Sequence, residues 1–244
     1  MGKVLAFVSG KGGTGKTSMC AAIATCLAAQ GQQVLCMDLD IGLRNLDLAL
    51  GVAEEPLLPF TGLMDGSCTP EELAPCGAVP NLRVLTAPVT AEPESIDRDA
   101  FTAMVAACKE RYDFCLLDAP AGIGAGFRLC VAAADEIIVV TGGEPAALRD
   151  GARAASLLPD PAIPAQVLVN RVSKPMYRRM VATVDDVMDA VGLPLLGIVP
   201  EDCTVTLAAA AGQPLILESR RGAAAACLRI SRRLLGQNVP LRTR

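Results

Sequence analysis

The sequence predicts an α/β protein built on one mostly parallel, twisted β-sheet with helices on both faces. Two observations predict this fold class. Seven short apolar runs rich in β-branched residues recur along the chain, and most are separated by stretches of helical character. Within these runs the apolar residues are continuous, which is typical of parallel strands buried on both faces. Ligands of such sheets bind at the carboxyl ends of the strands, so functional residues are expected there.

The predicted elements follow one another in a regular order. The strands span 4–8, 33–37, 82–86, 114–117, 136–141, 165–169 and 195–199. Helical patterns cover 17–29, 98–111, 145–158 and about 219–235, and Gly236 follows the last one where a helix C-cap favours glycine. Repeated Pro and Gly residues at 51–81 indicate a loop-rich excursion with one short helix near 70–74.

The bulk composition narrows the class of protein. The 244 residues are 52% hydrophobic and no repeat or composition shift divides them, so we predict one domain over 1–244. A net charge of −4 argues against a broadly basic surface, and nucleic acid is not an expected partner. No charge-free apolar run reaches the roughly 18 residues that cross a bilayer, which predicts a soluble protein.

The ten cysteines are not arranged as a disulfide or metal framework. No C-x-x-C pair occurs and the chain has no histidine, so neither a zinc site nor a metal-sulfur cluster is expected within it. This usage is typical of a reduced, cytoplasmic protein. Seven of the cysteines fall inside apolar periodic segments and are expected in the core: Cys20, Cys26, Cys36, Cys108, Cys115, Cys130 and Cys227.

Residues 10–17 match the phosphate-binding pattern G-x-x-x-x-G-K-[ST], directly after the first strand and before the first helix. In this context backbone N–H groups and the helix N-terminus surround phosphate oxygens. Lys16 is expected to reach the β- and γ-phosphates of ATP, and the Thr17 hydroxyl to bind Mg²⁺. The alternative is a glycine-rich turn, which needs no lysine or hydroxyl at fixed positions. The predicted nucleotide-binding residues of this loop are Gly12, Gly13, Thr14, Gly15, Lys16, Thr17 and Ser18.

Three aspartates end the predicted strands beside this loop. Asp38 and Asp40 open a segment at 38–48 with the features of switch I, and we assign Asp40 to the attacking water and Asp38 to the Mg²⁺ shell. Asp118 lies in a segment at 114–124 that fits Walker B and switch II; it is expected to bind Mg²⁺, and Gly122 lets the loop approach the γ-phosphate. Acidic residues at strand ends are also common solubilising positions.

Two later strand ends are candidates for base recognition. Asn170 can offer an amide donor and acceptor to adenine, with Arg171 beside it. Guanine-reading P-loop proteins typically carry an aspartate three residues after this asparagine, whereas here the position is Ser173, so ATP is favoured over GTP. The other wall of the base pocket is predicted at Pro200, Glu201 and Asp202. A plain turn between strand and helix is the alternative for both segments.

The motif K-G-G-T-G-K-T at 11–17 resembles the deviant Walker A family of P-loop ATPases, which includes the MinD and ParA proteins. Within that family the chain is similar to the MinD branch at D-I-G-L-R-N-L-D-L (40–48), D-A-P-A-G-I (118–123), E-P-A-A-L-R-D (144–150) and I-V-P-E-D (198–202). The resemblance extends from about residue 3 to 236.

The resemblance implies a function. Lys11 would contact the nucleotide of a second subunit, so that ATP produces a homodimer, and Lys11, Lys16 and Asp40 would carry out hydrolysis. A protein of this branch positions the bacterial division site, recruits a MinC-like inhibitor, responds to a MinE-like activator and cycles between cytoplasm and membrane. Arg44 and Asp150 would take part in partner binding. A solvated loop lysine is the alternative for Lys11, and surface salt bridging for Arg44 and Asp150.

Two departures from the family pattern bear on partners. Gly124 stands where MinD proteins commonly have a glutamate. Only eight residues, 237–244, follow the last predicted helix, too few for the usual basic amphipathic membrane helix, and the apolar face of that last helix is expected to pack on the domain. The alternative function is therefore a cargo-positioning or cofactor-maturation ATPase that is not anchored to a membrane. A module that binds without hydrolysing is opposed by Lys16, Thr17, Asp40 and Asp118.

Overall fold

One seven-stranded sheet organises the computed structural model, which describes residues 2–89, 91–173, 175–176 and 184–241. The strand order is β3-β2-β4-β1-β5-β6-β7 and each neighbouring pair is parallel, which confirms the predicted fold class. All seven predicted strands are present, and no strand end is shifted by more than three residues. Their bounds are β1 Lys3–Val8, β2 Val34–Asp38, β3 Leu82–Leu85, β4 Phe114–Asp118, β5 Glu136–Gly142, β6 Ala165–Val172 and β7 Leu195–Pro200.

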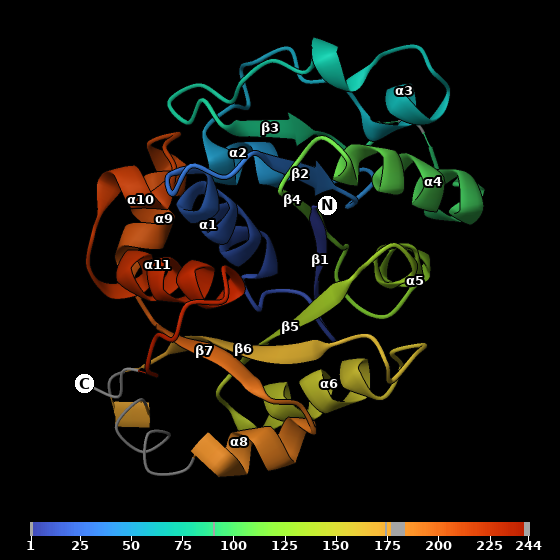
Figure 1. Ribbon diagram of the computed structural model, residues 1–244. Coiled ribbons are helices and arrows are strands. Elements are labelled where there is room, and N and C mark those ends of the chain that lie inside the picture. Colours follow the sequence, from blue (N-terminus) through green and yellow to red (C-terminus); the bar gives the residue numbers. More distant parts are fainter. Residues whose placement is uncertain (1, 90, 174, 177–183, 242–244) are drawn as a thin grey trace.

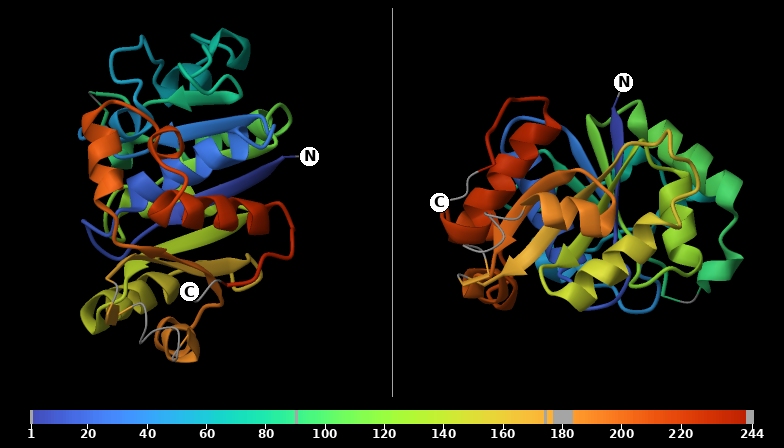
Figure 2. Two further views of the ribbon diagram at one scale, coloured as in Figure 1. Left: turned by 90° about the vertical axis from the view of Figure 1, so that its left-hand side faces the viewer. Right: turned by 90° about the horizontal axis from the view of Figure 1, so that it is seen from below.

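Helices cover both faces of the sheet, as Figures 1 and 2 show. On one side lie α1 (Lys16–Ala28), α2 (Leu46–Leu50), α9 (Cys203–Ala210), α10 (Leu215–Glu218) and α11 (Gly222–Leu234). On the other lie α3 (Phe60–Met64), α4 (Arg98–Lys109), α5 (Ala125–Ala132), α6 (Pro145–Ala155) and α8 (Val184–Val191). The four predicted helices correspond to α1, α4, α6 and α11. The remaining helices were not predicted, because each has at most eight residues and tertiary packing rather than a long apolar period stabilises it.

The central strand β1 shows how the sheet separates two cores. Leu5 and Phe7 point into the cluster beneath α1 and α11, whereas Val4, Ala6 and Val8 point into the cluster beneath α4 and α5. All five side chains are at most 1% exposed. Burial on both faces explains why the apolar run is continuous. The seven cysteines expected in the core are buried, whereas Cys203 is exposed.

The excursion at 51–81 covers the β3 edge of the sheet (Figure 1). Its backbone bridges to the strand through Pro59 and Thr86, and Phe60 meets Phe101 of α4 edge to face, with ring centroids 5.7 Å apart. The helix expected near 70–74 is a single 3-10 turn, Pro70–Glu72, closed by a capping box from Thr69. A second such turn spans Pro93–Ser95. The short helix α3 was not predicted.

The C-terminal helix packs as expected. Its apolar face is buried, and Gly236 adopts a left-handed conformation (φ 78°) in which its N–H donates to the Arg233 carbonyl. The Arg233 guanidinium then donates to the carbonyls of Leu196, Val239 and Pro240, which ties the following segment to β7. Of the predicted tail, Arg242, Thr243 and Arg244 lie outside the described residues.

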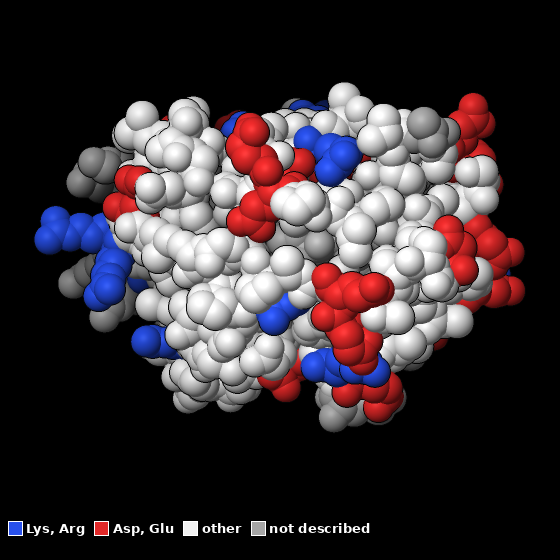
Figure 3. Space-filling view, turned by 90° about the horizontal axis from the view of Figure 1, so that it is seen from above, with Lys and Arg blue, Asp and Glu red and all other residues white. Residues whose placement is uncertain are grey.

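The face seen in Figure 3 has no broad basic area: acidic and basic side chains lie in small groups, some next to each other, on a largely uncharged surface. The described helices are all too short, or too polar, to cross a bilayer.

Candidate nucleotide site

The loop between β1 and α1 has the backbone that a phosphate cradle requires. Gly15, the N-cap of α1, is left-handed with φ 81°, and a Cβ there would come within 2.3 Å of the Asn170 amide nitrogen. A Cβ on Gly10 would lie 2.1 Å from the Asp150 carbonyl oxygen. Glycine is therefore required where the loop meets β6 and α6. The cavity above the loop has about 340 Å³ and is lined by Ser9, Lys11, Gly12, Gly13, Thr14, Gly15, Lys16, Thr17, Asp40, Leu43, Asn45, Ala121 and Arg171.

A buried ion pair lies beneath this loop. The Lys16 ammonium is 2.6 Å from Asp118 Oδ1, and both residues are almost fully buried. Burial by itself would lower the pKa of Lys16, but the attraction and hydrogen bond of Asp118 outweigh it and raise that pKa. Burial raises the pKa of Asp118 to about 6, against the opposing effect of Lys16. The pair is therefore ionised at neutral pH, with its cation at the base of the phosphate cavity.

The same carboxylate leaves one oxygen for a metal ion. Asp118 Oδ2 is buried and has no hydrogen-bond partner among the described residues. The Thr17 hydroxyl lies 3.5 Å from the Lys16 ammonium and so belongs to the same group. A carboxylate and a hydroxyl are hard oxygen ligands of the kind that Mg²⁺ prefers. The residues present therefore fit a magnesium ion, which Thr17 and Asp118 would hold.

The pKa of Asp118 predicts an unusual pH dependence of stability. A carboxyl whose folded pKa (about 6) exceeds its unfolded pKa (about 4) binds its proton more tightly in the folded state. Its contribution to stability is present below pH 4 and is lost as the pH rises through 6. We expect the unfolding free energy of the nucleotide-free protein, relative to Asp118→Asn, to fall by about 2 kcal/mol between pH 4 and 7. Urea unfolding at several pH values measures this, and a difference that does not change with pH would contradict it.

The Asp38 carboxylate accepts hydrogen bonds from backbone N–H groups, a role that the sequence did not predict. Its Oδ1 accepts from Asp40 N (2.8 Å), and its Oδ2 accepts from the N–H groups of Asn45 and Leu46, both at 3.0 Å. Asp38 thereby fixes the switch I loop and caps α2. Asp38 is the register partner of Asp118 across β2 and β4, which places the two residues side by side. The place of Asp38 in the Mg²⁺ shell stays a prediction.

Asp40 lies in the phosphate cavity and is only partly buried. Burial, and then the neighbouring charge of Asp38, raise the pKa of its carboxyl, whereas Lys16 opposes this shift. A raised pKa makes Asp40 a better proton acceptor from a water molecule than an ordinary aspartate. This property suits the role that the sequence suggested for it.

Lys11 is held by α6 of its own chain. Its ammonium lies 3.2 Å from Asp150 Oδ2, and the two side chains are 52% and 41% exposed. An ion pair this exposed contributes at most about 1 kcal/mol, so it can be exchanged for another contact. The structure thus joins two residues that the sequence linked only to separate partner contacts. Arg44, the other residue predicted to contact a partner, has a left-handed backbone (φ 45°). Its guanidinium lies 3.9 Å from Asp47, and its buried Nε has no hydrogen-bond partner among the described residues.

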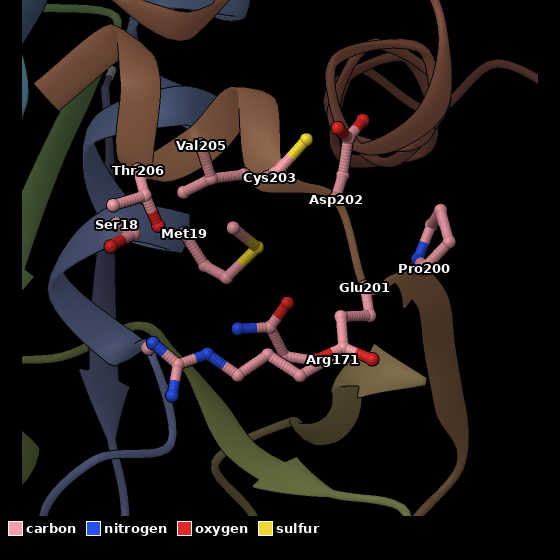
Figure 4. A pocket seen from close by; sticks show the side chains of 11 residues that line it. Ser18, Met19, Arg171, Pro200, Glu201, Asp202, Cys203, Val205 and Thr206 are labelled. Carbon is pink, nitrogen blue, oxygen red and sulfur yellow. The ribbon is translucent and has the colours of Figure 1, made fainter. Parts of the chain in front are cut away.

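A second cavity of about 410 Å³ adjoins the first (Figure 4). Gly15 and Arg171 line both cavities, so one elongated ligand can extend from one into the other. The predicted base residues of β6 and β7 come together here. The lining residues are Gly15, Ser18, Met19, Asn170, Arg171, Pro200, Glu201, Asp202, Cys203, Val205 and Thr206.

Some polar groups of this second cavity already form hydrogen bonds within the chain. The Asn170 amide donates to the Thr14 carbonyl at 2.9 Å, and the Arg171 guanidinium donates to the Gly13 carbonyl at 2.8 Å. The bond to Thr14 uses one of the two N–H groups of the Asn170 amide, so Asn170 can still present its carbonyl oxygen and one N–H group to a base, as the sequence suggested. An acceptor suits the amino group of adenine.

Asp202 also has a structural role. Its carboxylate accepts from Thr204 N, at the start of α9, and from Ala223 N, at the start of α11, both at 3.0 Å. Burial opposes ionisation, but these hydrogen bonds outweigh it and lower the pKa of Asp202. In Figure 4 its carboxylate points away from Arg171. Asp202 therefore positions this wall rather than offering its charge to a base.

Several residues of the two cavities were not predicted. Leu43, Asn45 and Ala121 lie within the predicted switch segments, and the motifs could have indicated them. Met19 of α1 and the α9 residues Cys203, Val205 and Thr206 belong to no motif, and only the tertiary structure brings α9 to the same cavity as Met19.

The fold, the phosphate loop and the two joined cavities define a P-loop nucleotide-binding protein. The family model described as the CobQ/CobB/MinD/ParA nucleotide binding domain matches residues 5–215, and the chain belongs to this family. Within it, the septum site-determining protein MinD of Synechocystis sp. is 35% identical, over 98% of this chain and 92% of that protein. The MinD of Bacillus subtilis is 33% identical over 99% and 92%.

Solved structures agree with this assignment. A MinC:MinD cell division protein complex from Aquifex aeolicus matches with a TM-score of 0.86 and 33% identity, covering 98% of both chains. MinD from Pyrococcus horikoshii, solved with Mg-ADP, matches with a TM-score of 0.82 and 26% identity over 98% and 100%. The resemblance seen in the sequence is confirmed.

Proposed function

We propose that this chain is a septum-site-determining ATPase of the MinD type, which binds ATP with Mg²⁺ and hydrolyses it. One observation carries the proposal: a single cavity gathers Lys11, Lys16, Thr17 and Asp40 around a glycine-rich loop. The MinD relatives, which match over nearly the whole chain, support the same function. The cavity joined to it has the size and the acceptor for an adenine base.

The residues of the site would act mainly by positioning charge. Bound Mg²⁺ supplies charge neutralisation at the phosphate oxygens. Lys16 would leave Asp118 to bind the phosphates, while Asp118 and Thr17 hold the metal ion. Asp40, with its raised pKa, would orient the attacking water and accept its proton. Lys11 would stabilise phosphate charge in a second subunit, as an arginine finger does.

Assembly and partners follow from the same proposal. Lys11 needs a second nucleotide to contact, so we propose a homodimer that forms when ATP is bound. The MinC:MinD complex of Aquifex aeolicus supports a MinC-like partner. A MinE-like activator, and a cytoplasmic protein that cycles to the membrane, belong to the proposal as well. Arg44 and Asp150 are its candidate partner contacts, and no nucleic acid is expected. A cargo-positioning or cofactor-maturation ATPase is not favoured, since the Synechocystis and Bacillus subtilis relatives, each above 30% identity, are septum site-determining proteins.

The variant Asp40→Ala tests the proposal, with its oligomeric state measured by light scattering in the presence of ATP, of ADP and of no nucleotide. This variant lacks the group that orients water, so we expect it to hydrolyse ATP at least 100-fold more slowly and to accumulate as a dimer with ATP alone. Asp99→Ala removes an exposed carboxylate outside both cavities and should behave as the unaltered protein. If Asp40→Ala stays monomeric with ATP, the ATP-dependent dimer is wrong.

A further inference from the structure

Helix α9 presents an uncharged and mostly apolar stripe to solvent. No charged residue occurs from Cys203 through Gln213. Positions i, i+3, i+4 and i+7 of this helix, namely Cys203, Thr206, Leu207 and Ala210, are all exposed, and Leu207 is 61% exposed. A surface helix normally places polar residues on this face and apolar residues beneath it. We call these four residues the α9 stripe.

Neighbouring helices extend the apolar surface. Leu217 of α10 and Leu48 of α2 are 52% and 51% exposed, and both helices pack against α9. The stripe also reaches the nucleotide site, because Cys203 and Thr206 line the second cavity (Figure 4). At the other end of the site Leu43, which is 72% exposed, lines the phosphate cavity. Exposed apolar side chains therefore border both ends of the nucleotide site.

The charges around the stripe indicate what covers it. Glu201 lies two residues before Cys203, the first residue of α9, and Glu218 ends α10; both glutamates are exposed. Arg220 and Arg221 are also exposed and lie beside the start of α9, because Asp202 accepts from both Thr204 N and Ala223 N. The charges of these two acidic and two basic side chains cancel, whereas a surface that binds anionic lipid needs an excess of basic residues. In a two-fold contact between identical surfaces, the acidic side chains of one copy can face the basic side chains of the other.

We propose that the α9 stripe is an interface for a second copy of this chain, and that it adds to the contact at the phosphate loop when ATP is bound. The proposal rests on the ATP-dependent dimer of the proposed function. It gives that dimer a second contact in addition to Lys11. The centre of this contact is uncharged and lies at Leu207, and its rim carries both acidic and basic side chains. Exposed apolar residues free of charge are what the centre of such an interface uses.

Leu207→Glu tests the stripe without touching either cavity. The Asp40→Ala background keeps ATP intact, and dimer dissociation is measured by sedimentation with ATP. We expect Leu207→Glu to weaken the dimer at least tenfold, while a fluorescent ATP analogue binds the monomer as before. Val89→Glu, at a residue 70% exposed after β3, is the matched control and should leave the dimer unchanged.

The outcomes separate the two proposals. An unchanged dimer in Leu207→Glu overturns the stripe and leaves the proposed function intact, whereas no dimer in the parent protein overturns both. Loss of ATP binding in Leu207→Glu would place that residue in the nucleotide site and overturn the interface. Binding of anionic vesicles that Leu207→Glu alone abolishes, with the dimer intact, would make the stripe a lipid contact instead.

Cys203 offers a second readout in the native sequence. It is exposed and the other nine cysteines are buried, so a short bis-maleimide reagent should react at this position. We expect ATP to increase the yield of cross-linked dimer several-fold over ADP, and Cys203→Ser to remove the product. Equal yields with ATP and ADP would overturn the link between the stripe and the nucleotide.

Discussion

Replacing Lys16 by methionine should abolish ATP hydrolysis and destabilise the nucleotide-free protein. The substitution removes the cation that lies 2.6 Å from buried Asp118. Breaking a buried pair by removing one partner costs about 3 to 5 kcal/mol. Because Asp118 can take up a proton, we expect the lower figure, about 3 kcal/mol, in the unfolding free energy at pH 7. Hydrolysis should fall at least 100-fold, since the same ammonium is needed at the phosphates.

The sign of the pH effect makes this prediction specific. Without Lys16 the folded pKa of Asp118 must rise above its present value of about 6, so the carboxyl is neutral at pH 5 and the loss of stability shrinks there. The chain has no tryptophan, so circular dichroism in urea is the suitable measurement. A loss of stability that is equal at pH 5 and pH 7 would contradict the assigned cause.

Lys109→Met is the matched control. It removes another ammonium that lies 2.6 Å from an aspartate, Asp135, but outside both cavities. It should cost some stability and leave hydrolysis unchanged. The double variant Lys16→Met, Asp118→Asn should recover part of the stability, because it leaves no unpaired buried charge, yet it should not recover hydrolysis.

Replacing Lys11 by alanine should preserve the stability that Lys16→Met loses, but should abolish assembly of the dimer. The Lys11 contact with Asp150 is half exposed, so its removal should change the unfolding free energy by less than about 1 kcal/mol. Affinity of the monomer for nucleotide should persist, because Lys16 remains. The ATP-dependent dimer should disappear and turnover should fall at least 100-fold, as expected for a charge supplied across an interface. Light scattering and phosphate release measure the two losses.

The variants Arg98→Ala and Asp150→Asn complete this test. Arg98→Ala removes a more exposed ion pair, with Asp99, and should change neither property. Asp150→Asn frees Lys11 from its contact within the chain and should retain the dimer. If Lys11→Ala turns over ATP at the normal rate, Lys11 has no part in the reaction.

The strands and the phosphate loop could be predicted because their signals are local. A run such as Val4–Val8 is short and apolar at every position, which is typical of a strand covered on both faces. Likewise the loop at 10–17 encodes its own conformation through glycines at set positions. Short helices such as α3 and α9 have no comparable signal, because contacts with distant segments stabilise them.

The sequence by itself determined the residue types that the proposed chemistry would use: the two lysines of one loop, and the aspartates that end β2 and β4. Only the tertiary structure decided what each of them contacts. It engages Asp38 and Asp202 with backbone N–H groups, pairs Lys11 with Asp150, and brings α9 to the second cavity. The physical reason is that the type of each side chain is set by its own position in the sequence, whereas its hydrogen-bond partner can lie more than 150 residues away, as with Asn170 and Thr14 or Arg171 and Gly13.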